Sequence, residues 1–403
     1  MVVDRKYLKT HKWITFSYDP KWIDARTWLL LGEAQSKIEH LARASLKPKV
    51  AEKLLQIYLT KGVHATTKIE GNTLTLEEVA ARLEARTTPA TSRGYLVQEV
   101  DNVLDALNKA MREAEQNPMT NLTVEDVQAF NRGVLSGLNV EDHVDPGHFR
   151  VAKVGVMRYE GAPPEDVEYL TVRMCDWINE LRSDDRSFAS ANALIRAILA
   201  HLYIAWIHPF GDGNGRTARL VEWKILLTSG FPQPATHLLS NFYCRTRDEY
   251  YAKLDLASRD NDPSHFIRYA IRGFVDEIRE QLNTVWEQQD ELVWLDYLHE
   301  QFPDENGKAS IRQRHLLIDL TTVGVTSRER AISVAQIPKL ELSRFERDYG
   351  KLTPKSLGRD LIAITLRGLL VRTSDRKIFV NRDIVRAFRP QAIHPTLPGI
   401  DSR

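Results

Sequence analysis

The densest group of chemically active residues is the segment His208-Pro-Phe-Gly-Asp-Gly-Asn-Gly-Arg-Thr-Ala-Arg219. Three glycines close together, Gly211, Gly213 and Gly215, allow backbone N–H groups to converge in a concave loop. The loop opens onto the start of a helix predicted near Arg216. Converging amides, the positive end of a helix dipole and two arginines together form a site suited to phosphate groups.

Two further side chains of this segment add chemistry to the phosphate site. Asp212 can hold a Mg²⁺ ion that also ligates phosphate oxygens. His208 precedes Pro209, which disfavours helix at the residue before it. The imidazole has a pKa near working pH, and its neutral form accepts a proton. The residues alone therefore predict phosphate chemistry with a nucleotide, a metal and a general base.

The elements that position this segment read mainly as helices. Apolar residues recur at three- and four-residue spacing through most of the first 290 residues. This period predicts helices over 51–59, 95–107, 124–135, 167–181, 191–207 and 217–227. Thr75 to Glu78 and Thr123 to Asp126 have the spacing of capping boxes at helix starts. The active loop thus lies between two helices, and His201 in the first is expected to make structural hydrogen bonds.

One segment breaks the helical pattern. Residues 149–159 alternate and are rich in β-formers, and Glu160-Gly-Ala-Pro-Pro164 then turns the chain. We expect a short hairpin inserted among helices. Such a ribbon is only marginally stable by itself, so it must pack on the body or meet a partner.

The C-terminal stretch has a different character. It predicts helices over 311–320 and 356–368, then strands over 369–372 and 377–381, which is the order of a winged helix-turn-helix. Residues 305–391 carry 18 Lys and Arg against nine Asp and Glu, a net charge of +9 on a chain of net charge +1. Arg359 and Arg367 are candidates for DNA contact. Docking onto the acidic body, dimerisation and target recruitment remain equal alternatives.

Length and composition limit the class of protein. The chain has 403 residues with 43% hydrophobic and 27% charged residues, which is typical of two or three globular domains. Two cysteines without a Cys-x-x-Cys pair argue against disulfides and thiolate zinc sites and favour a reducing compartment. The N-terminus has no apolar signal stretch, and the longest apolar segment, 195–207, contains Arg196 and His201. We therefore expect a soluble cytoplasmic protein without a membrane partner.

The segment from His208 to Arg219 resembles the Fic-family motif His-Pro-Phe-x-Asp/Glu-Gly-Asn-Gly/Lys-Arg-x-x-Arg at every fixed position. Fic proteins are mostly adenylyltransferases that move AMP from ATP onto a hydroxyl of a target protein. The resemblance implies that His208 deprotonates a target Ser, Thr or Tyr, which attacks the α-phosphorus, and that Asp212 binds Mg²⁺. Members that phosphorylate carry a lysine where this chain has Gly215, so the glycine favours AMP transfer.

The resemblance also implies where ATP binds. The hairpin is similar to the family's flap, which aligns the target, and it is expected to contact ATP. Further contacts are expected from the glycine loop with its helix and from a helix over 248–258. The implied residues are Val156, Met157, Arg158, Tyr159, Asp212, Gly213, Asn214, Gly215, Arg216, Thr217, Ala218, Arg219, Tyr250, Tyr251 and Ser258. Some members carry an asparagine where this chain has Ser258.

A second family feature lies upstream. Thr66-Thr-Lys-Ile-Glu-Gly71 resembles the inhibitory pattern Ser/Thr-x-x-x-Glu-Gly/Asn. In such proteins the glutamate, here Glu70, reaches the second motif arginine, here Arg219, and blocks productive binding of the γ-phosphate. A carboxylate and a phosphate compete for the same guanidinium. The resemblance therefore implies a self-inhibited enzyme, and it leaves open whether Glu70 also positions water for AMP removal.

These observations combine into one prediction. The fold is mainly α, with a Fic helical core and a β-hairpin flap, plus a small α+β winged helix-turn-helix domain. Predicted boundaries are an inhibitory helical region over 1–115, the catalytic domain over 116–260, a helical connector over 261–300 and the winged-helix domain over 301–403. The predicted function is Mg²⁺-dependent transfer of AMP from ATP to hydroxyls of target proteins or of the protein itself. The alternatives are a Fic-type phosphotransferase and a DNA-binding regulator whose body senses nucleotide, and the sequence leaves homodimer formation open.

Overall fold

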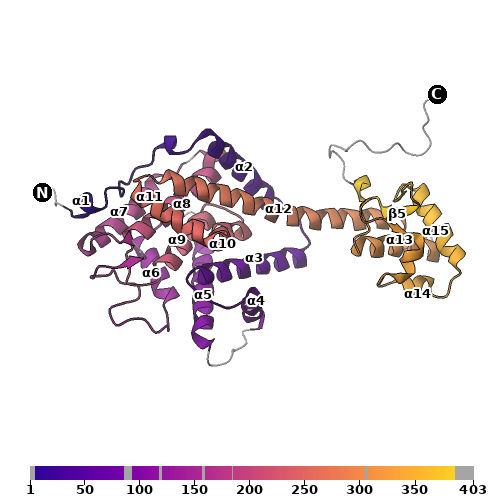
Figure 1. Cartoon of the computed structure of the whole chain (residues 1–403), viewed down its shortest axis with the longest axis horizontal. Coiled ribbons are helices and arrows are strands. Elements are labelled where there is room, and N and C mark those ends of the chain that lie inside the picture. Colours follow the sequence, from indigo (N-terminus) through magenta and orange to yellow (C-terminus); the bar gives the residue numbers. More distant parts are fainter. Residues whose placement is uncertain are drawn as a thin grey trace. The chain divides into compact units, whose positions relative to one another are not determined.

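The structure is a computed structural model that describes residues 5–85, 93–117, 120–156, 159–183, 185–304 and 307–385. The chain divides into two compact units, Met1–Val285 and Trp286–Arg403, and each is described by itself (Figure 1).

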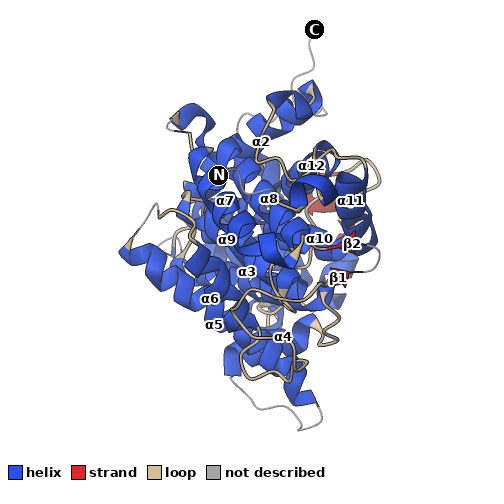
Figure 2. Cartoon of the chain, turned by 90° about the vertical axis from the view of Figure 1, so that its left-hand side faces the viewer, coloured by secondary structure: helices blue, strands red, loops and turns tan. Residues whose placement is uncertain are grey.

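The N-terminal unit is built almost entirely from helices (Figure 2). All six helices predicted from apolar periodicity are present, and both predicted capping boxes form at their helix starts. The helices are α1 (Tyr7–Thr10), α2 (Ala25–Ala42), α3 (Pro48–Ile69), α4 (Leu76–Ala85), α5 (Gly94–Gln116), α6 (Val124–Val134), α7 (Val167–Glu180), α8 (Ala189–Ile207), α9 (Asn214–Thr228), α10 (Leu238–Arg245), α11 (Arg247–Arg259) and α12 (Ser264–Gln301), which continues into the second unit. Short 3₁₀ turns occur at Pro20–Trp22, Pro164–Asp166, Arg186–Phe188 and Gln233–His237.

Helix α8 forms the centre of this unit, because nearly every one of its side chains is buried. It packs against α2, α7 and α9, as expected of a helix that is apolar on all sides. Among the described residues, α8 is also the helix long and apolar enough to cross a membrane, but 83% of its apolar window is buried inside the protein. Its buried Arg196 has a partner inside the protein, since Arg196 Nε donates to the Ile178 carbonyl at 2.8 Å.

The hairpin is shorter than the predicted β-rich segment. Its strands are β1 (Gly155–Val156) and β2 (Tyr159–Glu160), which pair antiparallel with Val156 opposite Tyr159. The prediction of strand from residue 149 was wrong for 149–154, which are irregular. There the backbone N–H of Arg150 donates to the Pro209 carbonyl at 3.0 Å instead of to a strand partner.

The C-terminal unit combines three helices with a small antiparallel sheet. The elements are α13 (Gly307–Thr322), β3 (Ile332–Ser333), a 3₁₀ turn (Val334–Lys339), α14 (Phe345–Tyr349), α15 (Pro354–Leu366), β4 (Leu370–Arg372), β5 (Lys377–Val380) and a last 3₁₀ turn (Arg382–Val385). The strand order is β3-β5-β4, and Leu370 lies opposite Val380. Both predicted helices and both predicted strands are found, whereas β3 and α14 were not predicted.

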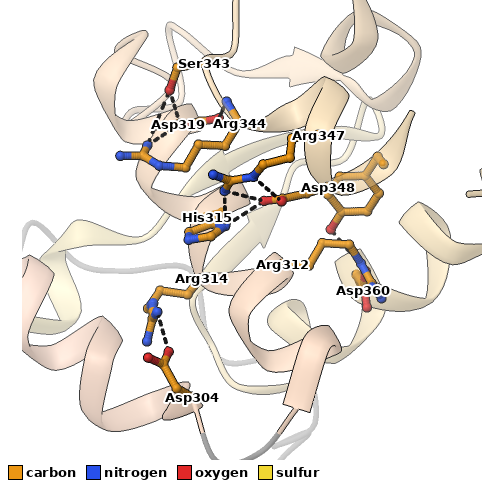
Figure 3. A network of polar contacts seen from close by, with 11 residues as sticks. Asp304, Arg312, Arg314, His315, Asp319, Ser343, Arg344, Arg347, Asp348 and Asp360 are labelled. Atoms are coloured by element: carbon orange, nitrogen blue, oxygen red, sulfur yellow. Dashed lines mark hydrogen bonds and ion pairs between the residues drawn. The ribbon is translucent and has the colours of Figure 1, made fainter. Parts of the chain in front are cut away.

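Several cations of the C-terminal unit pair with acids of the same unit (Figure 3). The buried carboxylate of Asp319 accepts hydrogen bonds from Ser343 and Arg344, the latter at 2.6 Å. The buried Asp360 carboxylate pairs with Arg312 at 2.7 Å. Figure 3 also shows the contacts of Asp304 with Arg314 and of Asp348 with His315 and Arg347.

Candidate active site

The glycine-rich loop joins α8 to α9 and is shaped by two left-handed residues. His208 ends α8 with φ 52°, and Gly213 begins α9 with φ 76°. Phe210 is fully buried and stacks on Phe149 with ring centroids 5.8 Å apart. The side chain of Asn214 brackets the loop, because it accepts from Phe210 N at 2.9 Å and donates to Phe210 O at 2.8 Å. The Asn214 amide therefore holds the loop.

Arg150 fixes the loop from outside, and sequence reasoning missed it. Its Nε donates to the His208 carbonyl at 2.6 Å, and its Nη2 donates to the carbonyls of Ala162 and Ile207. A side chain on Gly161 would collide with this guanidinium and with His208, so only glycine fits at this position after the hairpin. No motif points to Arg150, since it stands alone in a segment that resembles a strand.

Two other polar side chains were also missed. Asn131 of α6 is fully buried, donates to the Asp212 carbonyl at 2.8 Å and accepts from Gly147 N at 2.9 Å. Glu99 of α5 accepts a hydrogen bond from Arg216 Nη1 at 2.9 Å. Both are isolated polar positions on helices whose apolar pattern gives no reason to select them.

The side chain of His208 is half-buried beside the loop. Burial, with the nearby positive charge of Arg150, lowers the pKa of His208 to about 4. The imidazole is therefore neutral at physiological pH and able to accept a proton.

Two arginines of α9 present buried hydrogen-bond donors. Arg219 is almost completely buried, and its Nε donates to Thr66 Oγ1 at 2.8 Å. Arg216 is also buried. Within the described part of the chain, Arg216 Nε and Arg219 Nη1 have no hydrogen-bond partner. Buried donors are nearly always paired in folded proteins, so these two nitrogens point to an anion as their partner.

Glu70 follows the last residue of α3 and faces the first turn of α9. Its Oε1 accepts from Arg219 Nη2 at 2.5 Å, which is the contact that the Thr66–Gly71 pattern implied. Burial acts to raise the pKa of Glu70, but the charges of Arg219, Arg216 and Arg247 outweigh burial and lower the pKa below its usual value. A side chain at Gly215 would collide with Glu70 Oε1. The ionised carboxylate thus occupies the space that a side chain at position 215 would need.

Helix α11 brings its two tyrosines to this region in different ways. Tyr250 is buried, hydrogen-bonds His201 Nε2 at 2.9 Å and stacks on Tyr243 with ring centroids 4.9 Å apart. Tyr251 donates to the Ile69 carbonyl at 3.4 Å, next to Glu70. Ser258 lies further along, and its hydroxyl donates to the Asp255 carbonyl of its own helix.

Of the remaining predicted site residues, Asp212 lies at the loop, and Thr217 and Ala218 are buried in the N-terminal unit. The Asp212 side chain is 54% exposed, with Oδ1 accepting from Gly213 N and Oδ2 3.8 Å from Arg216 Nη2. Thr217 and Ala218 are buried against the body.

The predicted flap contacts are only partly visible. Tyr159 donates its hydroxyl to the Trp206 carbonyl at 2.7 Å, and its ring packs near Trp13. Tyr159 therefore supports the hairpin on α8. The side chain of Val156 and both Met157 and Arg158 lie outside the described residues.

Comparison with known proteins gives related sequences over the same region. Residues 121–226 match the Fic/DOC family. The chain is 30% identical over 253 residues to "Protein adenylyltransferase fic-1" of Caenorhabditis briggsae, covering 62% of this chain and 46% of that protein. It is 31% identical to "Protein adenylyltransferase Fic" of Drosophila grimshawi, covering 61% of this chain and 47% of the other. The chain thus spans about half the length of these curated relatives.

Solved structures share the fold. Fic-1 of C. elegans (residues 134–508) matches with a TM-score of 0.53 and 25% identity, over 65% of this chain and 74% of that one. A Fic family protein from Desulfovibrio desulfuricans matches with a TM-score of 0.53 over 91% of this chain and 97% of that one. At 19% identity the second likeness is one of fold alone.

Proposed function

The chain contains a Fic/DOC family domain at residues 121–226, and on this premise we propose that it transfers AMP from ATP to hydroxyl groups of proteins. The observation that carries the proposal is a pair of buried guanidinium nitrogens at the start of α9, Arg216 Nε and Arg219 Nη1, which have no hydrogen-bond partner among the described residues. The names of the matched relatives, protein adenylyltransferases, support the same activity.

The residues of the loop fit a Mg²⁺-nucleotide. Converging backbone amides from Gly213 to Gly215, the N-terminus of α9 and both arginines are suited to the β- and γ-phosphates. Mg²⁺ is usually held by one or two carboxylates together with substrate phosphates, and Asp212 offers such a carboxylate at the loop surface. A metal bound there supplies neutralisation of the phosphate charge.

The proposed reaction uses His208 as general base. A target hydroxyl gives its proton to the neutral imidazole, and its oxygen forms a bond to the α-phosphorus of ATP. The bond from the α-phosphorus to the bridging oxygen breaks, so AMP stays on the target and pyrophosphate leaves. Positioning and charge neutralisation contribute most to such a transfer, which is why the rigid support of the loop by Arg150 and Asn214 matters.

We further propose that Glu70 inhibits this reaction. Arg219 cannot pair fully with Glu70 and with a γ-phosphate at once, because both anions require the same guanidinium. With Glu70 in place, ATP would bind with its phosphates displaced from the productive position.

The two alternatives have less support. Phosphotransfer is disfavoured by Gly215, which stands where phosphorylating members carry lysine. A DNA-binding regulator would need the cations of α15, yet Arg367 lies over the Phe302 ring at 4.5 Å and donates to the Gln301 carbonyl. Arg359 on α15 and Arg367 directly after this helix are both exposed.

The test incubates the wild type, Glu70→Gly and Glu70→Gly/His208→Ala with Mg²⁺, cell lysate and ATP labelled at the α- or γ-position. We expect protein label from the α-position only, strongest in Glu70→Gly and absent in the double variant. A matched control adds His143→Ala to Glu70→Gly, because His143 is half exposed and contacts only Glu141 among the described residues. Label from the γ-position would indicate a kinase, and no label in any sample would favour the regulator.

A further inference from the structure

A small cationic cavity lies on the N-terminal unit, away from the glycine loop. It has a volume of about 220 Å³ and is bounded by the first turns of α2 and α12 and by α11. Four permanently charged cations line it together with two carboxylates: Arg26, Lys253, Arg268, Arg272, Asp24 and Glu249.

Only two of the four cations are paired with the acids beside them. Arg272 lies 3.3 Å from Glu249, and Arg268 lies 3.8 Å from Asp24, so each carboxylate already faces one arginine. Arg26 and Lys253 have no side-chain hydrogen bond or ion pair with any described residue. Two positive charges, of exposed Arg26 and partly buried Lys253, are therefore left over along the lining of the cavity, where they favour an anion.

The backbone adds to this field. Helix α2 is 18 residues long and begins at Ala25, so the positive end of its dipole lies at the cavity. The Asp24 side chain caps α2 by accepting from Thr27 N at 2.8 Å, which fixes the position of Arg26 on the first turn.

From these contacts we propose that the cavity binds a small phosphate anion, either inorganic phosphate or pyrophosphate. Arginine and lysine side chains converging from three helices are the donors that phosphate oxygens require. The volume is below the roughly 300–1,000 Å³ of pockets that hold drug-sized ligands, so a compact anion fits and a nucleoside does not.

The cavity is separated from the proposed nucleotide site by a layer of tyrosine rings. Tyr269 lines the cavity and stacks on Tyr243 at 6.1 Å, and Tyr243 stacks on Tyr250 at 4.9 Å. Helix α11 contributes to both sites, since Tyr250 is buried among the tyrosine rings and Glu249 and Lys253 line the cavity. The anion site is thus a second site whose existence does not depend on AMP transfer.

The experiment titrates the full chain with sodium pyrophosphate, and separately with sodium phosphate, in a calorimeter at constant ionic strength. We expect the wild type to bind at least one of the two anions, and Arg26→Gln/Lys253→Gln to lose at least tenfold in affinity. Arg259→Gln removes an exposed cation of α11 outside the cavity and should bind as the wild type does. The titrations are repeated in an Arg216→Gln background, which weakens phosphate binding at the glycine loop, and the cavity double variant should show the same tenfold loss there.

Three results would overturn the proposal. Neither anion binds the wild type up to roughly 10 mM; the cavity double variant keeps its affinity; or the effect of the double variant disappears in the Arg216→Gln background. Because Arg26 is exposed and Lys253 only partly buried, the double variant should fold, and circular dichroism checks this. The relative affinity of phosphate and pyrophosphate identifies which of them the cavity prefers.

Discussion

Arg219 is the residue for which two anions compete. It donates to Thr66 and to Glu70, and one of its nitrogens has no partner within the described chain. We predict that Glu70→Gly raises the rate of AMP transfer by about 10–100-fold, since a hydrogen bond between charged groups contributes roughly 1.5–3 kcal/mol. Incorporation of α-labelled phosphate into protein measures the change. Glu70→Gln keeps the shape of the side chain without its charge, so its transfer rate should lie between those of the wild type and Glu70→Gly. Equal rates in all three proteins would rule out inhibition by Glu70.

His208 has an environment that keeps it neutral. Its pKa of about 4 results from burial first and from Arg150 second, so the imidazole carries a charge only below that pH. We predict that a non-hydrolysable ATP analogue raises this pKa, because phosphate charges favour the protonated ring. Histidine NMR titration, assigned with His208→Ala, gives both values. A midpoint near 6.5 in the free protein would contradict the buried environment described here.

The same substitution tests the chemistry. His208→Ala should reduce transfer by about 10²–10⁴-fold, the usual contribution of a general base, and leave ATP affinity nearly unchanged. Rate and affinity are compared in the Glu70→Gly background, where activity is measurable. Retained transfer would exclude His208 as the base.

At the scale of elements, the loop depends on Arg150. Arg150→Ala would leave the carbonyls of His208 and Ala162 without this donor, whereas Ile207 O keeps the Ala162 N–H, and buried unsatisfied groups cost about 1–3 kcal/mol each. We predict a loss of about 3–5 kcal/mol in unfolding free energy and loss of transfer, measured by urea denaturation and labelling. Arg173→Ala removes an exposed pair with Glu180 and should cost at most about 1 kcal/mol. Similar losses in both variants would show that the carbonyl contacts are unimportant.

The elements also show what the sequence can and cannot predict. Helices such as α8 and α9 follow from local periodicity, and the positions of His208 and Arg219 follow from a dense motif. Arg150, Asn131 and Glu99 act through contacts between distant segments, and single polar residues leave no periodic signal. The predicted strand was too long for the same reason, because Arg150 N donates to the Pro209 carbonyl and not to a neighbouring strand.

At the scale of the whole molecule, buried histidines make the N-terminal unit sensitive to acid. Burial lowers the pKa of His237 to about 4, as it does for His208. The unfolded chain then binds more protons between pH 6.5 and 4, so the stability is complete above pH 6.5 and falls as the pH decreases. We predict a loss of roughly 1–3 kcal/mol between pH 7 and 5, measured by urea denaturation. His237→Gln should flatten this dependence, and an unchanged slope would exclude His237 as its source.

The contacts of each cation show which positive charges of the C-terminal unit already have a partner within the unit. Arg312, Arg314 and Arg344 pair with acids of the same unit (Figure 3). Arg367 packs on Phe302. Pairs within residues 305–391 are already subtracted in the net charge of +9, and of these three pairs only that of Arg314 with Asp304 uses an acid outside this range. The predicted winged-helix contacts remain a prediction for this unit.

The collision between Glu70 and any side chain at position 215 has a consequence for how this protein can evolve. A lysine at position 215, the residue of phosphorylating relatives, would have to displace the carboxylate that restrains Arg219. The choice of transferred group and the restraint on activity are then linked in one mutational step. A substitution at position 215 that changed the transferred group would therefore also change the contact of Glu70 with Arg219.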